Sequence, residues 1–564
     1  MSRMKKVLIV KKLGIFSLIF SLIFRLIHSN VYFYKIGKSL DRRFIRLFLS
    51  KCSILEIDFH ACSYQNDFIL TFGKKDDSTS QVTNNIFNID IVSKFLPIFT
   101  NIENPEEKIK ACFHKFVTTR CEDLLIITMW IQAYFDDESC KSNTFYLLDN
   151  VCTIKKNYLK NNANLANIIP VTSSNFFFFI ERVIILIKSS VIILFKKIFS
   201  RKLSNKSGNL LNSKLKNINI DSFKVLFFPH QSIFFGDLFV KDHFYSDDKN
   251  SIYYQSNILH IELDQTSFDE QQIKRYEERN INTVVLNNSS ISELFNNAIK
   301  VLKAIKLKLN TRLFISKDSI FLYFMYLQSV SFLAKKTILK EFSQAKIALI
   351  GYEMLFPPMM YLALESNNIK TVASQERFMA STFYENWPFM PNHYLCSSNF
   401  VCKTIKKSKV KFYNSCFPCG LVRTDFLFDI RKDIQKINTK YFPQKDKLIV
   451  AFDFHSKLDR ELNRIDPLLN WKSNNSFYLD LIKLAKKFPN IYIVIRGKNT
   501  NWTEIDFFQE TVHEINLLPN IEINKDYNEP YLQYEMAMRA DLIIAKHTSI
   551  GEELIPINKP VLFY

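Results

Sequence analysis

Ala540-Asp-Leu-Ile-Ile-Ala-Lys-His-Thr-Ser-Ile-Gly-Glu-Glu-Leu554, followed by Asn558-Lys-Pro-Val-Leu-Phe-Tyr564, is the stretch that decides the fold. An apolar run ends at Ala545, polar residues follow it, and a helical pattern begins near Ser549. Residues 560–563 form another short apolar run, which is typical of a buried strand in a parallel sheet. This order of strand, loop, helix and strand predicts one unit of a parallel α/β sheet.

The same alternation continues upstream. Short apolar runs read as strands, and apolar residues at helical spacing read as helices. In chain order these elements are 448–452, 477–487, 491–495, 521–523 and 531–539. A long loop containing Trp471 is expected after the first strand. Residues 441–564 are therefore predicted to form a Rossmann-like doubly wound domain.

A second series of such elements lies before this domain. The expected strands and helices are 223–228, 259–263, 270–279, 283–286, 291–309, 321–340, 347–350, 358–367, 371–373 and 394–396. We predict a second Rossmann-like domain over residues 222–440. The fold class is therefore α/β, with two doubly wound parallel-sheet domains.

The N-terminal third is less regular. Residues 1–165 contain strand-like runs at 54–59 and 144–148 and a helical pattern over 106–134, which predicts an α/β extension of unassigned role. Residues 166–221 combine a long apolar segment with a linker rich in Ser, Asn and Lys.

That apolar segment, 175–199, has the pattern of an amphipathic membrane-contact helix. Glu181, Arg182 and Lys188 interrupt it, which disfavours a simple membrane span. Basic side chains beside its apolar arc favour an anionic membrane surface. We expect a cytoplasmic protein peripheral on the inner face of the cell membrane; the alternative is a buried core helix.

The charge balance narrows the choice of partners. The 564 residues carry a formal net charge of +20, which suits an anionic membrane or a phosphorylated substrate. The lysines are dispersed, and no zinc-finger, helix-turn-helix or aromatic RNA-binding signature is present. Nucleic acid is therefore not an expected partner.

Candidate binding residues follow the predicted strands, because ligands of open parallel sheets bind at the carboxyl ends of the strands. Arg496 and Lys498 follow one strand and supply positive charge. After the next strand come the remaining candidates, His547, Thr548, Ser549, Gly551, Glu552 and Glu553. A helix start of this kind offers free backbone N–H groups to a phosphate. The alternative is a capping box between Ser549 and Glu552 that needs no ligand.

The run from Ala540 to Tyr564 resembles the donor-site strand-helix-strand of GT-B glycosyltransferases, especially those of bacterial surface and capsular polysaccharides. The order of elements is similar from Phe223 onward. Related epimerases and glycerophosphotransferases have similar stretches. The resemblance implies a nucleotide-sugar donor, contacted by the polar residues after Ala545 and by a helical glutamate, either Glu552 or Glu553.

An inverting sugar transfer also needs a base that removes the proton of the acceptor hydroxyl. His230 is the first candidate, because it directly follows the predicted strand 223–228. Asp237, Glu353 and Glu376 are the next candidates in this domain. A histidine after a strand is also commonly a hydrogen-bonded loop residue.

No metal or cofactor is predicted. Cys416 and Cys419 have the spacing of a metal-ligand pair, but no second Cys pair or His pair has matching spacing. The ten cysteines show no disulfide framework and are expected to be reduced.

The leading interpretation is a metal-independent glycosyltransferase that acts on a lipid-linked or growing polysaccharide acceptor. The alternatives are a CDP-glycerol-type glycerophosphotransferase, a sugar-nucleotide epimerase, and a non-catalytic scaffold in polysaccharide assembly. GT-B folds usually continue past their last strand with helices that cross back to the first domain. Because the sequence stops at Tyr564, we expect either a C-terminal truncation or a chain without those helices.

Overall fold

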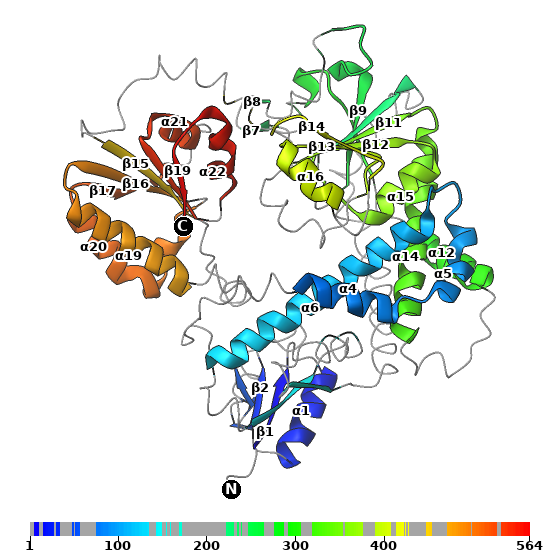
Figure 1. Cartoon of the computed structure of the whole chain (residues 1–564), viewed down its shortest axis with the longest axis horizontal. Helices are drawn as coiled ribbons and strands as arrows, with labels where there is room; N and C mark the ends of the chain where they lie inside the picture. The colour runs from blue at the N-terminus through cyan, green and yellow to red at the C-terminus, as the bar shows by residue number, and fades with distance from the viewer. Residues whose placement is uncertain are drawn as a thin grey trace, which may run out of the picture. The chain divides into compact units, whose positions relative to one another are not determined.

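The computed structural model describes the chain in separate segments (Figure 1). They are 5–10, 15–27, 30–33, 48–49, 51–52, 54–56, 75–134, 143–148, 168–171, 222–229, 234–235, 238–239, 246, 248–263, 276–286, 291–305, 318–353, 356–375, 390–407, 413–421, 447–453, 471–497, 499–526, 532–546 and 548–564, with single residues 154, 158, 274, 424 and 427. The chain divides into two compact units, Met1–Asn217 with Ser289–Lys335, and Ile218–Asn288 with Lys336–Tyr564.

The first unit contains a five-stranded parallel sheet. Its strands are β1 (Lys5–Val10), β2 (Asn30–Phe33), β3 (Ile54–Glu56), β4 (Asn143–Leu148) and β5 (Ile168–Val171). Their order is β3-β2-β1-β4-β5, so the first strand is central and the sheet grows outward on both sides. This order matches the first five strands of the Rossmann order 3-2-1-4-5-6. The predicted α/β extension is thus itself a Rossmann-like sheet.

Helices of the first unit come from two distant parts of the sequence. They are α1 (Ile15–Ile27), α4 (Lys75–Ile86), α5 (Ile89–Phe95), α6 (Pro105–Tyr134), α12 (Ile291–Ile305) and α14 (Asp318–Leu339), with the 3-10 turn η2 (Leu96–Ile98). Phe113 of α6 lies 4.7 Å from Phe321 of α14, and Phe99 lies 4.8 Å from Phe332 (ring centroids). Residues 289–335 therefore pack with the N-terminal unit, although they fall inside the predicted 222–440 domain.

The second unit contains a seven-stranded parallel sheet of order β10-β9-β6-β11-β12-β13-β14. Its strands are β6 (Val225–Phe228), β9 (Ile258–Glu262), β10 (Asn282–Val285), β11 (Ile347–Ile350), β12 (Lys370–Ser374), β13 (His393–Cys396) and β14 (Ser415–Pro418). Helices α15 (Pro358–Ser366) and α16 (Asn399–Lys407) connect successive strands, and β7 (Phe234–Phe235) pairs with β8 (Leu238–Phe239) in a short hairpin. Strand β14 was not predicted.

The C-terminal sheet has the order β17-β16-β15-β18-β19, and all its strands are parallel. Its strands are β15 (Lys447–Phe452), β16 (Ile491–Arg496), β17 (Ile521–Ile523), β18 (Leu542–Ala545) and β19 (Val561–Phe563). Its helices are α19 (Trp471–Lys487), α20 (Gln509–Leu517), α21 (Leu532–Arg539) and α22 (Ser549–Leu554). Short 3-10 turns lie at η12 (Asn501–Glu504), η13 (Asp506–Phe508) and η14 (Ile555–Ile557).

Alternate residues of β15 face opposite cores of this domain. Ile449 and Ala451 pack against α19 and α20, whereas Val450 and Phe452 pack against α21 and α22. Figure 1 shows the two pairs of helices on either side of the sheet. The predicted α/β class and the two doubly wound parallel sheets are confirmed.

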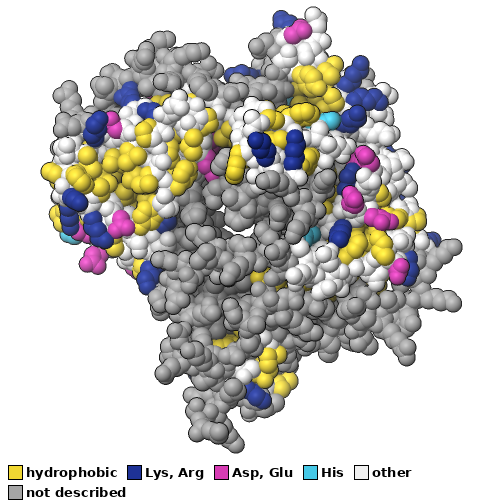
Figure 2. All heavy atoms as spheres, in the orientation of Figure 1, with side chains coloured by type: hydrophobic (Ala, Val, Ile, Leu, Met, Phe, Trp, Pro, Cys, Tyr) yellow, Lys and Arg dark blue, Asp and Glu magenta, His cyan; other side chains and the backbone are white. Residues whose placement is uncertain are grey.

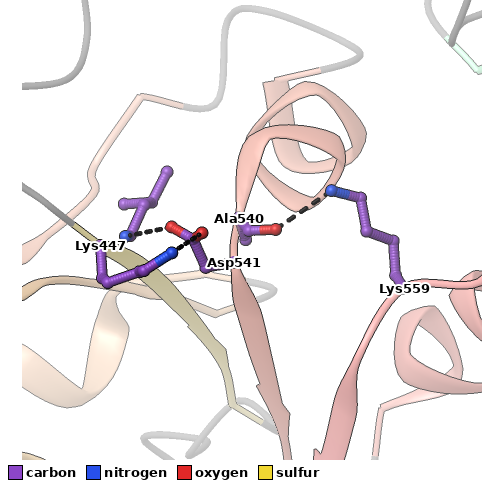
Figure 3. A network of polar contacts seen from close by, with 5 residues as sticks. Lys447, Ala540, Asp541 and Lys559 are labelled. Carbon is purple, nitrogen blue, oxygen red and sulfur yellow. Dashed lines mark hydrogen bonds and ion pairs between the residues drawn. The ribbon is translucent and has the colours of Figure 1, made fainter.

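The amino edge of the C-terminal sheet is held by a surface network (Figure 3). Asp541 accepts hydrogen bonds from Lys447 Nζ (3.0 Å) and from the backbone N–H of Leu448 (2.8 Å). Lys559 Nζ donates to the carbonyl of Ala540 (3.0 Å), just after α21 ends. These contacts set the register in which β15 and β18 begin.

The predicted loop around Trp471 is wrong, because Trp471 is the first residue of α19 and its side chain is buried. The predicted membrane-contact helix, 175–199, lies outside the described residues. Among the helices that the structure describes, none is both long and apolar enough to cross a membrane.

On the face drawn in Figure 2, Lys and Arg side chains are spread over the described parts, and hydrophobic side chains are frequent on the C-terminal domain. Leu562 and Phe563 of the edge strand β19 are about half exposed, at 52% and 50%.

Candidate functional site

The candidate site lies at the carboxyl edge of the C-terminal sheet, where the strand order reverses between β15 and β18. Asp453 directly follows β15, Lys546 directly follows β18, and Arg496 ends β16. The backbone N–H of Lys546 donates to Phe452 O (2.9 Å), and that of Asp453 donates to Arg496 O (3.2 Å). The sheet therefore brings these three charged residues to one edge, at a topological switch point where open α/β sheets bind ligands.

All three side chains are buried, with exposed fractions of 4% for Asp453, 4% for Arg496 and 2% for Lys546. Charged groups are almost never buried to this extent without a partner or a function. Neither Asp453 nor Lys546 was among the residues predicted from the sequence.

Asp453 is held on one side by an aromatic donor. Its Oδ2 accepts a hydrogen bond of 2.5 Å from the hydroxyl of Tyr478 in α19. Its Oδ1 is buried and accepts no hydrogen bond from the residues that the structure describes. Burial raises the pKa of Asp453 to about 6, although Tyr478 and the charge of Lys546 both act to lower it. A carboxyl group in this state can exchange a proton near neutral pH.

Gly497 makes room for this carboxylate. A Cβ atom at this position would lie 2.0 Å from Asp453 Oδ1, inside any allowed contact distance. Only glycine therefore permits Asp453 to lie against the chain that follows β16.

Lys546 reaches across the edge to the first turn of α19. Its Nζ donates to Ser473 Oγ (3.0 Å) and Ser473 O (2.6 Å), and lies 5.5 Å from the ring centroids of Phe477 and Tyr564. Burial lowers the pKa of Lys546 to about 8, and the charge of Asp453 opposes this change. Lys546 and Asp453 are thus two buried groups of opposite charge that interact electrostatically, and burial moves their pKa values toward each other.

Arg496 was predicted to contact a diphosphate. Its Nη1 donates to Asn524 Oδ1 and to Asp526 O, both in the segment after β17. These bonds fix the guanidinium at the carboxyl edge. Lys498, predicted beside it, lies outside the described residues.

The segment predicted to bind phosphate follows β18 and begins a short helix, α22. Thr548 is the N-cap residue of α22, and its side chain makes no capping hydrogen bond. Ser549 is the first helical residue, so the alternative of a capping box with Ser549 as N-cap is wrong. His547 lies outside the described residues.

The remaining residues predicted after β18 are directed into the domain. Glu553 is buried, and its Oε2 accepts a hydrogen bond from Tyr534 of α21 (2.8 Å). Glu552 is also buried. A Cβ atom on Gly551 would lie 2.6 Å from Ala545 Cβ, so Gly551 allows α22 to pack closely on β18.

The seven-stranded sheet has a switch point of its own, between β6 and β11. A Cβ atom on Gly351 would lie 2.9 Å from Pro229 O, so the two strand ends touch. Glu353, two residues later, is buried, and its Oε1 accepts a hydrogen bond from Tyr394 (3.2 Å). The other predicted bases, His230, Asp237 and Glu376, lie outside the described residues.

Comparisons with known proteins gave matches only among solved structures. No protein-family model matches the chain, and no curated protein matches it. A UDP-N-acetylglucosamine 2-epimerase from Rickettsia bellii is 12% identical, with a TM-score of 0.35, over 60% of this chain and 78% of that chain. A glycosyltransferase from Rickettsia africae is 14% identical, with a TM-score of 0.33, over 61% of this chain and 79% of that chain.

The wall teichoic acid polymerase TagF is 11% identical, with a TM-score of 0.31, over 68% of this chain and 79% of that chain. All three TM-scores are below 0.5, so these similarities carry no conclusion about the activity of this chain. Their scores are too low for a residue-by-residue correspondence, so the site rests on the geometry of this chain alone.

Proposed function

We propose that the chain is a glycosyltransferase that moves a sugar from a nucleotide-sugar donor to a lipid-linked or growing surface glycan. The observation that carries this proposal is the buried group of Asp453, Arg496 and Lys546 at the switch point of the C-terminal sheet. Ionisable groups with displaced pKa values at such a point favour a ligand site over a purely structural role.

The charges suit the donor. A nucleoside diphosphate leaves with additional negative charge, which cations at the strand ends stabilise. Arg496 and Lys546 bring positive charge to this edge, and Lys498 is a further candidate. Thr548 and Ser549 are proposed to bind the phosphate through hydroxyl and backbone N–H groups.

The acceptor step is proposed for the domain of the seven-stranded sheet. A base removes the proton from the acceptor hydroxyl, its oxygen bonds to the anomeric carbon, and the bond from that carbon to the donor phosphate breaks. His230 is the first candidate for the base, followed by Asp237, Glu353 and Glu376. Because residue charges neutralise the leaving group, no metal is required in this scheme.

The test is a thermal-shift screen of the full chain with UDP, CDP and CMP. We expect a nucleoside diphosphate to raise the melting temperature, because it binds only the folded state. Glycerol phosphate transfer from a CDP-linked donor would instead indicate the phosphotransferase, and epimerised sugar nucleotide would indicate the epimerase. If none of these nucleotides at millimolar concentration changes the melting temperature, the enzyme proposal fails in favour of a scaffold.

Replacement of one cation gives a sharper test of the site. We expect Arg496→Met to weaken nucleotide binding at least about tenfold, which is about 1.4 kcal/mol, because a charged contact to phosphate is lost. Lys447→Met is the matched control, since Lys447 lies at the opposite, amino edge of the same sheet. Isothermal titration of both variants checks this. Equal affinities for the two would contradict the location of the site.

We further propose that residues 175–199 hold the protein on anionic membrane. Sedimentation with vesicles should give binding that requires phosphatidylserine and weakens as salt rises. Lys196→Glu with Lys197→Glu should reduce this binding, whereas purely neutral vesicles should bind neither protein. Absence of binding at low salt would contradict membrane association without affecting the nucleotide test.

A further inference from the structure

Three cysteine thiols meet at the outer end of the seven-stranded sheet. Cys396 ends β13, Cys402 lies in α16, and Cys416 lies in the edge strand β14. All three are buried, and their sulfur atoms lie within 4.8 Å of one another. The sulfur atoms of Cys396 and Cys416 are 3.5 Å apart. Three consecutive elements of the chain thus converge on one cluster of thiols.

The spacing of these atoms suits a soft metal ion. Sulfur ligands about 2.3 Å from a tetrahedral Zn²⁺ lie about 3.8 Å from one another. One observed separation is 3.5 Å and none exceeds 4.8 Å, so movements of about 1 Å or less bring all three sulfur atoms to this spacing. A set of thiolates favours Zn²⁺ or Cu⁺ over the hard ions Mg²⁺ and Ca²⁺.

A fourth cysteine, Cys419, contacts the backbone of the cluster, although its sulfur is not among those that lie within 4.8 Å of one another. Cys419 follows Cys416 by three residues, and its backbone N–H donates to Cys396 O (2.9 Å). Its thiol is exposed and 3.6 Å from that same oxygen. Gly420 has φ +90°, which lets the chain turn directly after Cys419.

We propose that Cys396, Cys402 and Cys416 bind one Zn²⁺ ion and that Cys419 supplies the fourth ligand. Each thiol releases its proton as its sulfur bonds to the metal. Four protein ligands leave no position for water or substrate, so this ion is structural and not catalytic. It ties the edge strand β14 to β13 and α16. The site is independent of the proposed sugar transfer.

The sequence hid this site because only one pair has a familiar spacing. Cys416 and Cys419 form a C-x2-C pair, whereas Cys396 and Cys402 are six residues apart, at a strand end and in the helix after it. The parallel pairing of β13 with β14 is what brings the two pairs together.

Metal analysis of the purified full chain tests the proposal. After dialysis against zinc-free buffer, we expect one zinc per chain by inductively coupled plasma mass spectrometry. Cys402→Ser should lose most of this zinc, whereas Cys112→Ser, a buried thiol of the other unit, should keep it. Wild-type protein without bound zinc after incubation with the ion, or equal zinc in both variants, would overturn the site.

Two further measurements remain informative if Cys402→Ser does not fold. Cobalt added to metal-free wild-type protein should give a thiolate charge-transfer band, and zinc should protect the three buried cysteines from alkylation while Cys52 reacts as before. Cys419→Ser alters an exposed thiol and should weaken zinc binding at least tenfold. Unchanged affinity in that variant would overturn its assignment as fourth ligand. A disulfide between Cys396 and Cys416 in freshly purified protein would contradict the metal site.

Discussion

Asp453 is the residue in which the physical chemistry of the candidate site is clearest. It follows an apolar strand directly, lies against a glycine, and takes its hydrogen bond from Tyr478. The position after a predicted strand is the same signal that singled out Arg496. Applied to strands 448–452 and 541–545, that rule also finds Asp453 and Lys546. The sequence does not reveal their burial, because burial depends on how α19 covers this edge.

The raised pKa of Asp453 predicts a specific pH dependence. Between pH 3.8 and about 6, the folded chain holds a proton that the unfolded chain has released. The stabilisation of the fold by this tighter proton binding is fully present below pH 3.8 and is lost as the pH rises through 6. A shift of this size corresponds to about 3 kcal/mol.

We therefore expect Asp453→Asn to remove this pH-dependent loss of stability. As the pH rises from 4 to 6.5, the melting temperature of the variant should increase relative to that of the wild type. Scanning calorimetry across this range measures the difference. A constant difference between the two proteins would contradict the raised pKa.

Tyr478→Phe separates the hydrogen bond from the packing. The ring of Tyr478 stacks on Trp502 with centroids 4.0 Å apart, and phenylalanine keeps this contact. Without the hydroxyl, Asp453 Oδ2 also loses its hydrogen-bond donor, which should cost about 1–3 kcal/mol of stability near neutral pH. Because this hydrogen bond lowers the pKa of Asp453, the apparent pKa in the calorimetric profile should rise. An unchanged profile would show that the hydroxyl does not act on Asp453.

At the scale of elements, packing between α22 and β18 depends on a single glycine. We expect Gly551→Ala to destabilise the C-terminal domain by about 1–3 kcal/mol, because the added methyl group meets Ala545 and forces the helix outward. Thermal unfolding followed by circular dichroism measures this. Ser549→Ala in the same helix is the control and should change stability by less than about 0.5 kcal/mol. Equal effects of both would contradict the close contact.

Most elements of the C-terminal domain were predictable because their apolar runs are short and separated by polar residues. Helix α20 was missed, since its residues QETVHEINL carry few apolar side chains at helical spacing. The sequence predicts a loop for the first turn of α19 because Trp471 is followed by polar residues, and apolar residues at helical spacing begin only at Phe477. Strand β14 contains Pro418, which removes a backbone donor and is tolerated because β14 is an edge strand.

At the scale of the molecule, the sequence did not indicate that the chain enters each unit twice. Helix α12 has an amphipathic pattern and α14 is largely apolar, but neither pattern identifies the unit that buries the helix. The contact of Phe321 with Phe87 (5.1 Å between ring centroids) and Phe113 decides the assignment.

Phe321→Ala tests this division. Because Phe321 is fully buried, its truncation should cost about 3–5 kcal/mol locally. Hydrogen exchange should become faster in α6, far away in sequence, and remain unchanged in the C-terminal sheet. Phe477→Ala is the converse control, since it lies in the core between β15 and α19. Faster exchange in both regions for either variant would show that the two units unfold together.

In all three sheets an inner strand is synthesised before the strand that pairs with one of its edges. This order applies to β1 and β15 in the five-stranded sheets and to β6 in the seven-stranded sheet. Strand β1 leaves the ribosome long before β4, β6 long before β11, and β15 long before β18. In each case the most buried strand waits for a partner on one side, and its unpaired edge is open to other nascent segments. We expect ribosome-bound chains arrested between residues 453 and 542 to recruit chaperones strongly, and chains extended past β18 to release them.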